Sequence, residues 1–132
     1  MLTRLLIYSK FIDNPSLIPI FRKIQLIETI LEDVYFPSNF ASKLVERFPS
    51  LKCILLQIIS LNNCVFIIDT LLTHLKDLSY IKIKYFEDSL VDDPFSREKI
   101  IEKRRQAFPM NIIDEQLVNV KNNGEVLQIW LR

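Results

Sequence analysis

Residues that commonly carry chemistry are few in this sequence of 132 residues, which has one histidine, His74, and two cysteines, Cys53 and Cys64. Zinc sites need three or four cysteine or histidine ligands with close-spaced pairs, and these three residues form no such pair. A Ser–His–Asp triad would depend on His74, which falls near the end of a predicted helix, where histidine bonds the last carbonyls. We therefore expect no catalytic residue, no metal, no cofactor and no enzyme activity.

Glycine restricts the chemistry further, because Gly124 is the only glycine in the chain, against an average usage of roughly 7%. Phosphate-binding loops, dinucleotide-binding fingerprints and nucleophile elbows need glycine for positive φ or for close backbone approach. None of these motifs can be built from one glycine. The sequence therefore names no reaction, and its architecture has to indicate the function.

Cysteine usage and hydropathy indicate the compartment. Cys53 and Cys64 lie in apolar runs, which is typical of buried free thiols in a reducing compartment, whereas one disulfide would need a secreted protein. The apolar run near the N-terminus is too short for a signal peptide, and no run approaches the roughly 18 residues that span a bilayer. We expect a cytoplasmic protein, with the nucleus as the alternative, and no membrane partner.

Two charged segments contain residue types that bind ions. They are a basic face on a predicted helix (Arg97, Lys99, Lys103, Arg104, Arg105) and an acidic loop before it (Glu87, Asp88, Asp92, Asp93). The basic face could contact phosphate, but it lacks interleaved aromatic residues for base stacking, and a net charge of +1 gives no global field. The acidic loop lacks the spacing of an EF-hand. We expect a solvated helix face and a polar loop instead, and no nucleic-acid partner.

The elements that would position a site alternate between helix and strand. Strands are predicted at 4–8, 25–30, 51–58 and 80–85, a short helical connector at 16–21, and helices at 39–48, 64–76 and 95–108. The expected helix N-caps are Ser38, Asn62 or Asn63, and Asp93. This order predicts an α/β fold in one domain over residues 1–132, with parallel strands and helices on one side.

These elements repeat at an offset of 27 residues. Under this offset Leu44, Phe48, Leu51, Ile54 and Leu56 match Leu71, Leu75, Leu78, Ile81 and Ile83. One step further back, three of the four matching positions are apolar: Phe21, Ile24 and Ile27, followed by Thr29. Periods of 20 to 50 residues are typical of stacked repeats, and 27 lies in the leucine-rich-repeat range. The sequence therefore predicts a short solenoid of the leucine-rich-repeat type.

A β-hairpin over residues 117–131 is predicted to close this array. Asn123-Gly124 is a strong hairpin signal, since both loop residues of a type I′ turn take positive φ. The resulting register places Asn122 opposite Glu125, Val120 opposite Leu127 and Val118 opposite Ile129. The apolar pairs share one face, and Asn119 and Gln128 share the other. Such a hairpin would cap the last core layer of the array.

The repeat motifs carry a resemblance to a known family. Phe48-Pro49-Ser50-Leu51-x-x-Ile54-x-Leu56 and Leu75-x-x-Leu78-x-x-Ile81-x-Ile83 resemble the leucine-rich-repeat region of F-box-like proteins. Residues 92–97, 102–109 and 118–124 are similar to the end of invertebrate members of this family. The similarity covers about residues 14–132. The sequence departs from the family at Ile59 and Phe86, where an asparagine usually follows the strand motif.

The resemblance implies a protein–protein interaction module, because members of that family recognise targets for ubiquitin ligases. In them the F-box binds the ligase core and the repeats hold the target. Here Met1 falls almost directly on the first predicted strand, so the ligase core is an expected partner only if an F-box lies upstream. We expect the chain to be a C-terminal fragment or cap region of a longer product.

Outward residues on the strands form the binding face in repeats of this kind. The period aligns them in three rows: Leu26, Cys53 and Tyr80; Glu28, Leu55 and Lys82; and Ile30, Gln57 and Lys84. Such a patch, apolar and partly aromatic, would mark a partner site if it is open to solvent, the alternative being that another segment covers it. We expect protein binding without covalent chemistry. The alternative function is phosphate or nucleic-acid binding through the basic helix 97–105.

Overall fold

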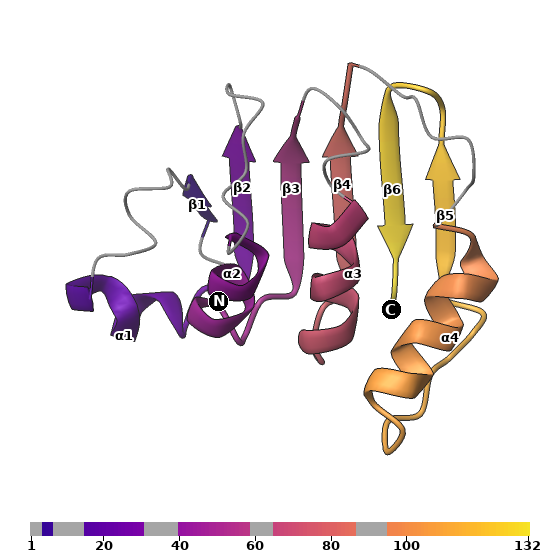
Figure 1. Ribbon diagram of the computed structural model, residues 1–132, viewed down its shortest axis with the longest axis horizontal. Coiled ribbons are helices and arrows are strands. Elements are labelled where there is room, and N and C mark those ends of the chain that lie inside the picture. Colours follow the sequence, from indigo (N-terminus) through magenta and orange to yellow (C-terminus); the bar gives the residue numbers. More distant parts are fainter. Residues whose placement is uncertain (1–3, 7–14, 31–39, 59–64, 87–94) are drawn as a thin grey trace.

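A computed structural model describes residues 4–6, 15–30, 40–58, 65–86 and 95–132 (Figure 1). The fold is mixed α/β, with an open sheet of strand order β1-β2-β3-β4-β6-β5. The strands are β1 (Arg4–Leu6), β2 (Leu26–Ile30), β3 (Cys53–Gln57), β4 (Tyr80–Lys84), β5 (Asn119–Asn122) and β6 (Val126–Trp130). The helices are η1 (Pro15–Leu17), α1 (Ile18–Phe21), α2 (Phe40–Arg47), α3 (Val65–His74) and α4 (Arg97–Ala107).

Strands β1 to β4 are parallel, as predicted, and β6 joins the sheet antiparallel to β4. Leu26 pairs with Cys53, and Cys53 pairs with Tyr80, so the offset of 27 residues is the pairing register from β2 to β4. Arg4 pairs with Leu26, an offset of 22. The constant period therefore covers three strands, and β1 joins them at a different spacing.

The turn between each helix and the next strand is built three times in the same way. The amide of Ile24 donates to the carbonyl of Phe21, at 3.2 Å, and the same bond joins Leu51 to Phe48 and Leu78 to Leu75, each at 3.3 Å. All six side chains are at most 2% exposed. Two equivalent apolar positions per unit thus fix how each chain segment turns from the helical layer into the sheet.

The core lies between one face of the sheet and helices α2, α3 and α4, which cover that face (Figure 1). Alternate strand residues point into it, and they are at most 3% exposed: Ile27, Ile54, Leu56, Ile81, Ile83, Leu127 and Ile129. Burying each such aliphatic side chain contributes roughly 1.5–3 kcal/mol. Because side chains alternate along a strand, the residues between them lie on the opposite face.

Helix α4 begins two residues later than predicted, because Ser96 and not Asp93 is its N-cap. Ser96 has an extended backbone (φ −65°, ψ 151°), and its Oγ accepts from the amide of Lys99 at 3.4 Å. The two other predicted caps, at Ser38 and at Asn62 or Asn63, lie outside the described residues. Within the described residues, no helix has the length and apolarity of a membrane span.

The hairpin forms, but its turn is displaced by one residue from the prediction. The amide of Asn123 donates to the carbonyl of Val126 at 3.3 Å, so the two loop residues are Gly124 and Glu125. Val120 therefore pairs with Ile129 and not with Leu127. Among the described residues only Gly124 has positive φ, +91°, because Asn123 instead uses its side-chain oxygen to accept from the Glu125 and Val126 amides. The side chains predicted to share a face still do so, because each residue of β5 pairs two positions further along β6 and side chains alternate with a period of two.

Candidate functional site

The three predicted rows run across the sheet face opposite helices α2, α3 and α4, which no described helix covers and which is called the uncovered face from here on. The pairing confirms each row: Leu26–Cys53–Tyr80, Glu28–Leu55–Lys82 and Ile30–Gln57–Lys84. Lys84 is exposed, and the other row members whose burial is described are half-buried: Leu26, Glu28, Cys53, Leu55, Gln57, Tyr80 and Lys82. The structure thus brings all the predicted binding residues together on one surface.

Strand β6 extends these rows with residues that the sequence prediction missed. Tyr80 pairs with Trp130, Lys82 with Gln128 and Lys84 with Val126. The alternation of residues 126–130 indicated that these three side chains share a face. The hairpin signal, however, did not show that β6 would lie beside β4, because a turn fixes only the pairing between its own two strands.

Aromatic and amide side chains meet where β4 and β6 lie side by side. The rings of Tyr80 and Trp130 are tilted by 40°, with centroids 5.5 Å apart. The Gln128 amide donates to the Tyr80 hydroxyl at 2.8 Å. Such contacts restrict the rotamers of half-buried side chains, so this end of the face presents a preformed surface.

Lysines lie on the same strands as this aromatic pair or beside them. The Lys121 Nζ lies 5.6 Å from the centroid of the Trp130 ring, in a cation–π contact. Lys121 lies opposite Gln128, which is itself opposite Lys82. Within the described part of the chain, neither Lys82 nor Lys84 forms a side-chain hydrogen bond or ion pair. Glu28 is the only carboxylate in the three rows, so the β4–β6–β5 end of the face is positive.

Cys53 lies in the middle of the apolar row, between Leu26 and Tyr80. It is a free cysteine, as predicted, but it is half-buried and not buried, because it occupies an outward position of β3. Burial raises the pKa of its thiol above the ordinary value of 9.0. The group is therefore a neutral thiol at physiological pH, and it acts as a small apolar side chain here. Cys64 lies outside the described residues.

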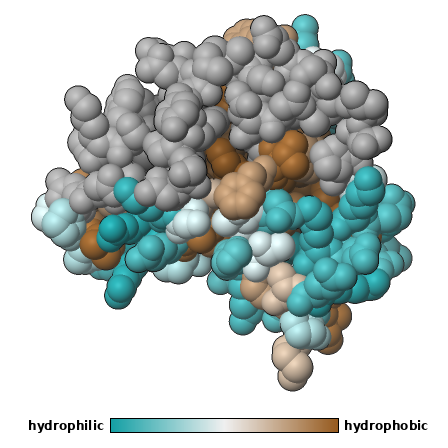
Figure 2. Space-filling view, viewed as in Figure 1, coloured by the Kyte–Doolittle hydropathy of each residue, from teal (hydrophilic) through white to brown (hydrophobic). Residues whose placement is uncertain are grey.

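The basic helix face predicted at 97–105 is only partly solvated (Figure 2, where hydrophilic side chains gather over α4). Arg97 donates through Nε to the Val118 carbonyl at 2.9 Å and through Nη2 to the Glu115 carbonyl. Lys103 forms an ion pair with Asp69, and Arg105 with Glu115. The basic side chains of α4 thus fasten the helix to α3 and to the segment before β5.

The prediction of a solvated helix face is most clearly wrong at Arg104, which is buried, with 7% of its surface exposed. Its guanidinium donates to the carbonyls of Leu72, Leu75 and Lys76 at 2.7–3.0 Å. These carbonyls lie at the C-terminal end of α3, where helix carbonyls lack partners within the helix. The long arginine side chain reaches them because α4 packs beside α3, which no local pattern in residues 97–105 indicates.

Of the remaining residues that the sequence analysis considered, His74 has a structural role and the acidic loop lies outside the described residues. His74 is the last residue of α3, with its Nδ1 3.0 Å from the Thr70 carbonyl, as expected for a helix end. The acidic loop residues (Glu87, Asp88, Asp92, Asp93) are outside the described residues. Among the residues that are described, no group of three His, Cys, Asp or Glu side chains could hold a metal ion.

Comparisons with protein-family models, with curated proteins and with solved structures find no match to this chain. The geometry of the uncovered sheet face is therefore the main indication of function.

Proposed function

We propose that the protein is a binding module that holds a segment of another protein on the uncovered face of its sheet, without covalent chemistry. The observation that carries the proposal is the alignment of half-buried apolar and aromatic side chains, in register across the strands, beside lysines. Apolar and aromatic side chains that reach solvent together in one patch commonly mark partner sites. The proposed architecture is a short leucine-rich-repeat-like unit, supported by the turn that recurs at every 27 residues.

The dimensions of the face suit a short extended segment. Six strands spaced by about 4.8 Å, with about five residues each rising about 3.3 Å, give a surface of roughly 24 by 16 Å. An extended peptide of about seven residues, rising about 3.3 Å each, spans the longer dimension of this surface.

The charges on the face favour an acidic segment with apolar residues at one end. Lys82 and Lys84 are two residues apart on β4, about 6.6 Å, which is also the spacing of alternate side chains in an extended peptide. Lys121 is two strands from Lys82, about 10 Å away. Leu26 and Leu55 provide the apolar end, so a partner with alternating carboxylates and an apolar anchor would complement the surface.

Target recognition in an F-box-type ubiquitin ligase adaptor is the proposed setting for this binding, and the resemblance of the repeat motifs supports it. Phosphate binding through residues 97–105 has weaker support. Arg97, Lys103, Arg104 and Arg105 all bond to groups of the protein itself, and phosphate would have to displace those bonds.

A photo-crosslinking experiment tests the proposed site. A photoreactive amino acid replaces Leu55 on the face in one variant, and Phe66, 63% exposed on the helical side, in a matched control. We expect a discrete partner to be trapped from position 55 only. The partner's segment is then purified, and its Kd for the whole chain is measured.

Two double variants connect that binding to the face. Tyr80→Ala with Lys82→Ala removes an aromatic ring and a charge from the face, and we expect it to weaken the Kd by at least tenfold. Phe66→Ala with Lys23→Ala removes an aromatic ring and a lysine charge elsewhere and should leave the Kd unchanged. Equal crosslinking at positions 55 and 66, or equal affinity of the two double variants, would contradict the proposal.

A further inference from the structure

A cleft lies at the lower end of the molecule, where α3 and α4 end and the chain leaves β6 (Figure 1). It is formed by the C-terminal ends of α3 and α4, the segment 108–118 and the residues that follow β6, and its volume is about 520 Å³. Pockets for small molecules typically have volumes of about 300–1,000 Å³. Three cationic side chains, Lys76, Arg104 and Arg132, line it together with apolar ones.

Arg104 gives this cleft a buried hydrogen-bond donor. A guanidinium has five N–H groups, and Arg104 makes three hydrogen bonds with described residues, all to carbonyls at the end of α3. It therefore retains donor capacity beyond its structural role. Because the side chain is 93% buried, its position is fixed before any ligand arrives.

The charges around Arg104 favour an anion. Burial and the neighbouring Arg132 lower the pKa of Arg104 to about 10, and Asp77 acts in the opposite direction. Arg132 lies 3.6 Å from Asp77 and donates to the Lys76 carbonyl. Asp114 is the carboxylate among the lining residues. Three cations against two nearby carboxylates leave a positive site, in which a bound anion would relieve the repulsion between the two arginines.

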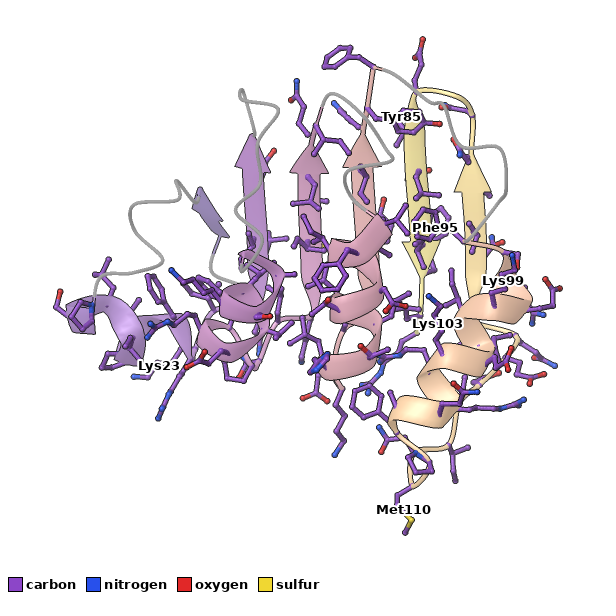
Figure 3. All side chains as sticks on the ribbon, in the orientation of Figure 1. Lys23, Tyr85, Phe95, Lys99, Lys103 and Met110 are labelled. Atoms are coloured by element: carbon purple, nitrogen blue, oxygen red, sulfur yellow. The ribbon has the colours of Figure 1, made fainter. Side chains whose placement is uncertain are left out.

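Apart from Asn111, the remaining lining residues are apolar, and several of them form an exposed rim. Phe108 lies against the Arg104 guanidinium, 4.9 Å from the ring centroid, and Leu131 forms part of the floor. Met110 is 93% exposed, Ile112 100% and Leu117 51%. Figures 2 and 3 show apolar side chains protruding at this tip, with Met110 at its end. Exposed apolar groups around a concave, partly charged site indicate a ligand with its own apolar part.

We propose that this cleft binds an amphiphilic carboxylate, with the carboxylate at Arg104 and Arg132 and the hydrocarbon chain along Phe108, Leu117 and Leu131. The buried arginine fixes the head group, and the apolar walls and rim remove the chain from water. This site is separate from the sheet face, so it stands whether or not that face binds a protein.

Calorimetric titration of the whole chain with dodecanoate, below its micelle concentration, tests the proposal. Dodecanol and dodecyltrimethylammonium carry the same chain with a neutral and a cationic head. We expect dodecanoate to bind at one site, at least tenfold more tightly than dodecanol, and the ammonium compound not to bind. Octanoate should bind less tightly by roughly fourfold for each CH₂ removed that had been buried, since one buried CH₂ contributes about 0.8 kcal/mol.

Two variants locate the site without disturbing the core. Arg132→Gln removes a half-exposed head-group charge, and Leu117→Asn polarises the wall; each should weaken dodecanoate binding by fivefold or more. Ile20→Asn is the matched control for Leu117→Asn, because the two side chains are similarly exposed, at 54% and 51%, and Ile20 lies on α1. This control should leave the affinity unchanged.

Three outcomes would overturn the proposal. They are equal affinity for dodecanoate and dodecanol, equal loss in the Leu117→Asn and Ile20→Asn variants, and binding to phosphatidylserine vesicles without binding to free dodecanoate. The last outcome would identify the exposed tip as a membrane-contact surface in place of a small-molecule site.

Discussion

Two sets of basic side chains in this protein differ in what they contact. On α4, Arg97, Arg104 and Lys103 bond to backbone carbonyls or to Asp69, so their charges hold the helix to its neighbours. On the sheet face, Lys82 and Lys84 form no side-chain hydrogen bond or ion pair with any described residue. In sequence, the α4 set is the more conspicuous, because its residues are closely spaced.

The density of basic residues is therefore a poor guide to a binding surface. A long side chain on a helix can reach the carbonyl ends of a neighbouring helix, where it satisfies groups that would otherwise lack partners. Lysines on β4 cannot do so, because the backbone on both sides of that strand is already paired. A lysine without a partner is therefore the better signal, and only the tertiary structure identifies it.

The largest change in stability is expected for Arg104→Ala. Loss of the guanidinium leaves three carbonyls at the end of α3 without their donor. Hydrogen bonds to charged groups contribute about 1.5–3 kcal/mol each, and these contributions are not additive. We expect the free energy of unfolding to fall by about 3 kcal/mol, measured by urea denaturation. Arg105→Ala is the control, because that side chain is exposed and should cost less than about 1 kcal/mol. Equal losses for Arg104→Ala and Arg105→Ala would show that the buried arginine stabilises the fold no more than an exposed one does.

Arg97→Ala should have an intermediate effect. The half-buried guanidinium bonds the Val118 and Glu115 carbonyls, which hold the segment before β5 against α4. We expect a loss of about 1–2 kcal/mol in unfolding free energy. Hydrogen exchange should accelerate more in the hairpin than in β2 and β3. A uniform acceleration over all strands would show that the arginine stabilises the whole fold and not this contact.

Lys103→Ala tests an ion pair at the surface. Lys103 and Asp69 are partly exposed, at 33% and 42%, and water screens such pairs. We expect a loss of about 0.5 kcal/mol at low ionic strength, which should shrink further in 1 M salt, measured by thermal unfolding in both conditions. A loss that is unchanged by salt would indicate that the methylene groups of the lysine, and not its charge, stabilise the contact.

The smallest effect on stability is expected for Lys82→Ala and Lys84→Ala. Since neither side chain has a partner within the described chain, each substitution should change the unfolding free energy by less than about 0.5 kcal/mol. Both variants should nevertheless weaken binding of the segment identified by crosslinking. A destabilisation of 1 kcal/mol or more would mean that these lysines have internal roles, as those of α4 do.

Much of the fold was predictable because the signals were local and repeated. Positions such as Phe21, Phe48 and Leu75 recur with equal spacing and equal chemistry, and equal spacing leads to equal register in adjacent parallel strands. The three rows of the face followed from the same arithmetic. Alternation then separated core positions from outward ones along each strand.

The errors arose where a residue's role depended on a distant element. Arg104 was predicted to be solvated, because the sequence does not show that α3 ends within its reach. Trp130 was missed as a neighbour of Tyr80, because the hairpin pattern does not identify the third strand beside it. The turn at Gly124 moved by one residue because Asn123 had two ways to satisfy the loop amides, and the side-chain bond was the one used.

The constant pairing offset from β2 to β4 has a consequence for engineering. A duplicate of residues 53–79, inserted after Ser79, would supply one more helix and one more strand with the same register on both sides. The added strand would widen the sheet by about 4.8 Å and lengthen each row by one side chain, while β4 would keep its partner β6. The width of the sheet face therefore depends on the number of 27-residue units, and not on the conformation of any one loop.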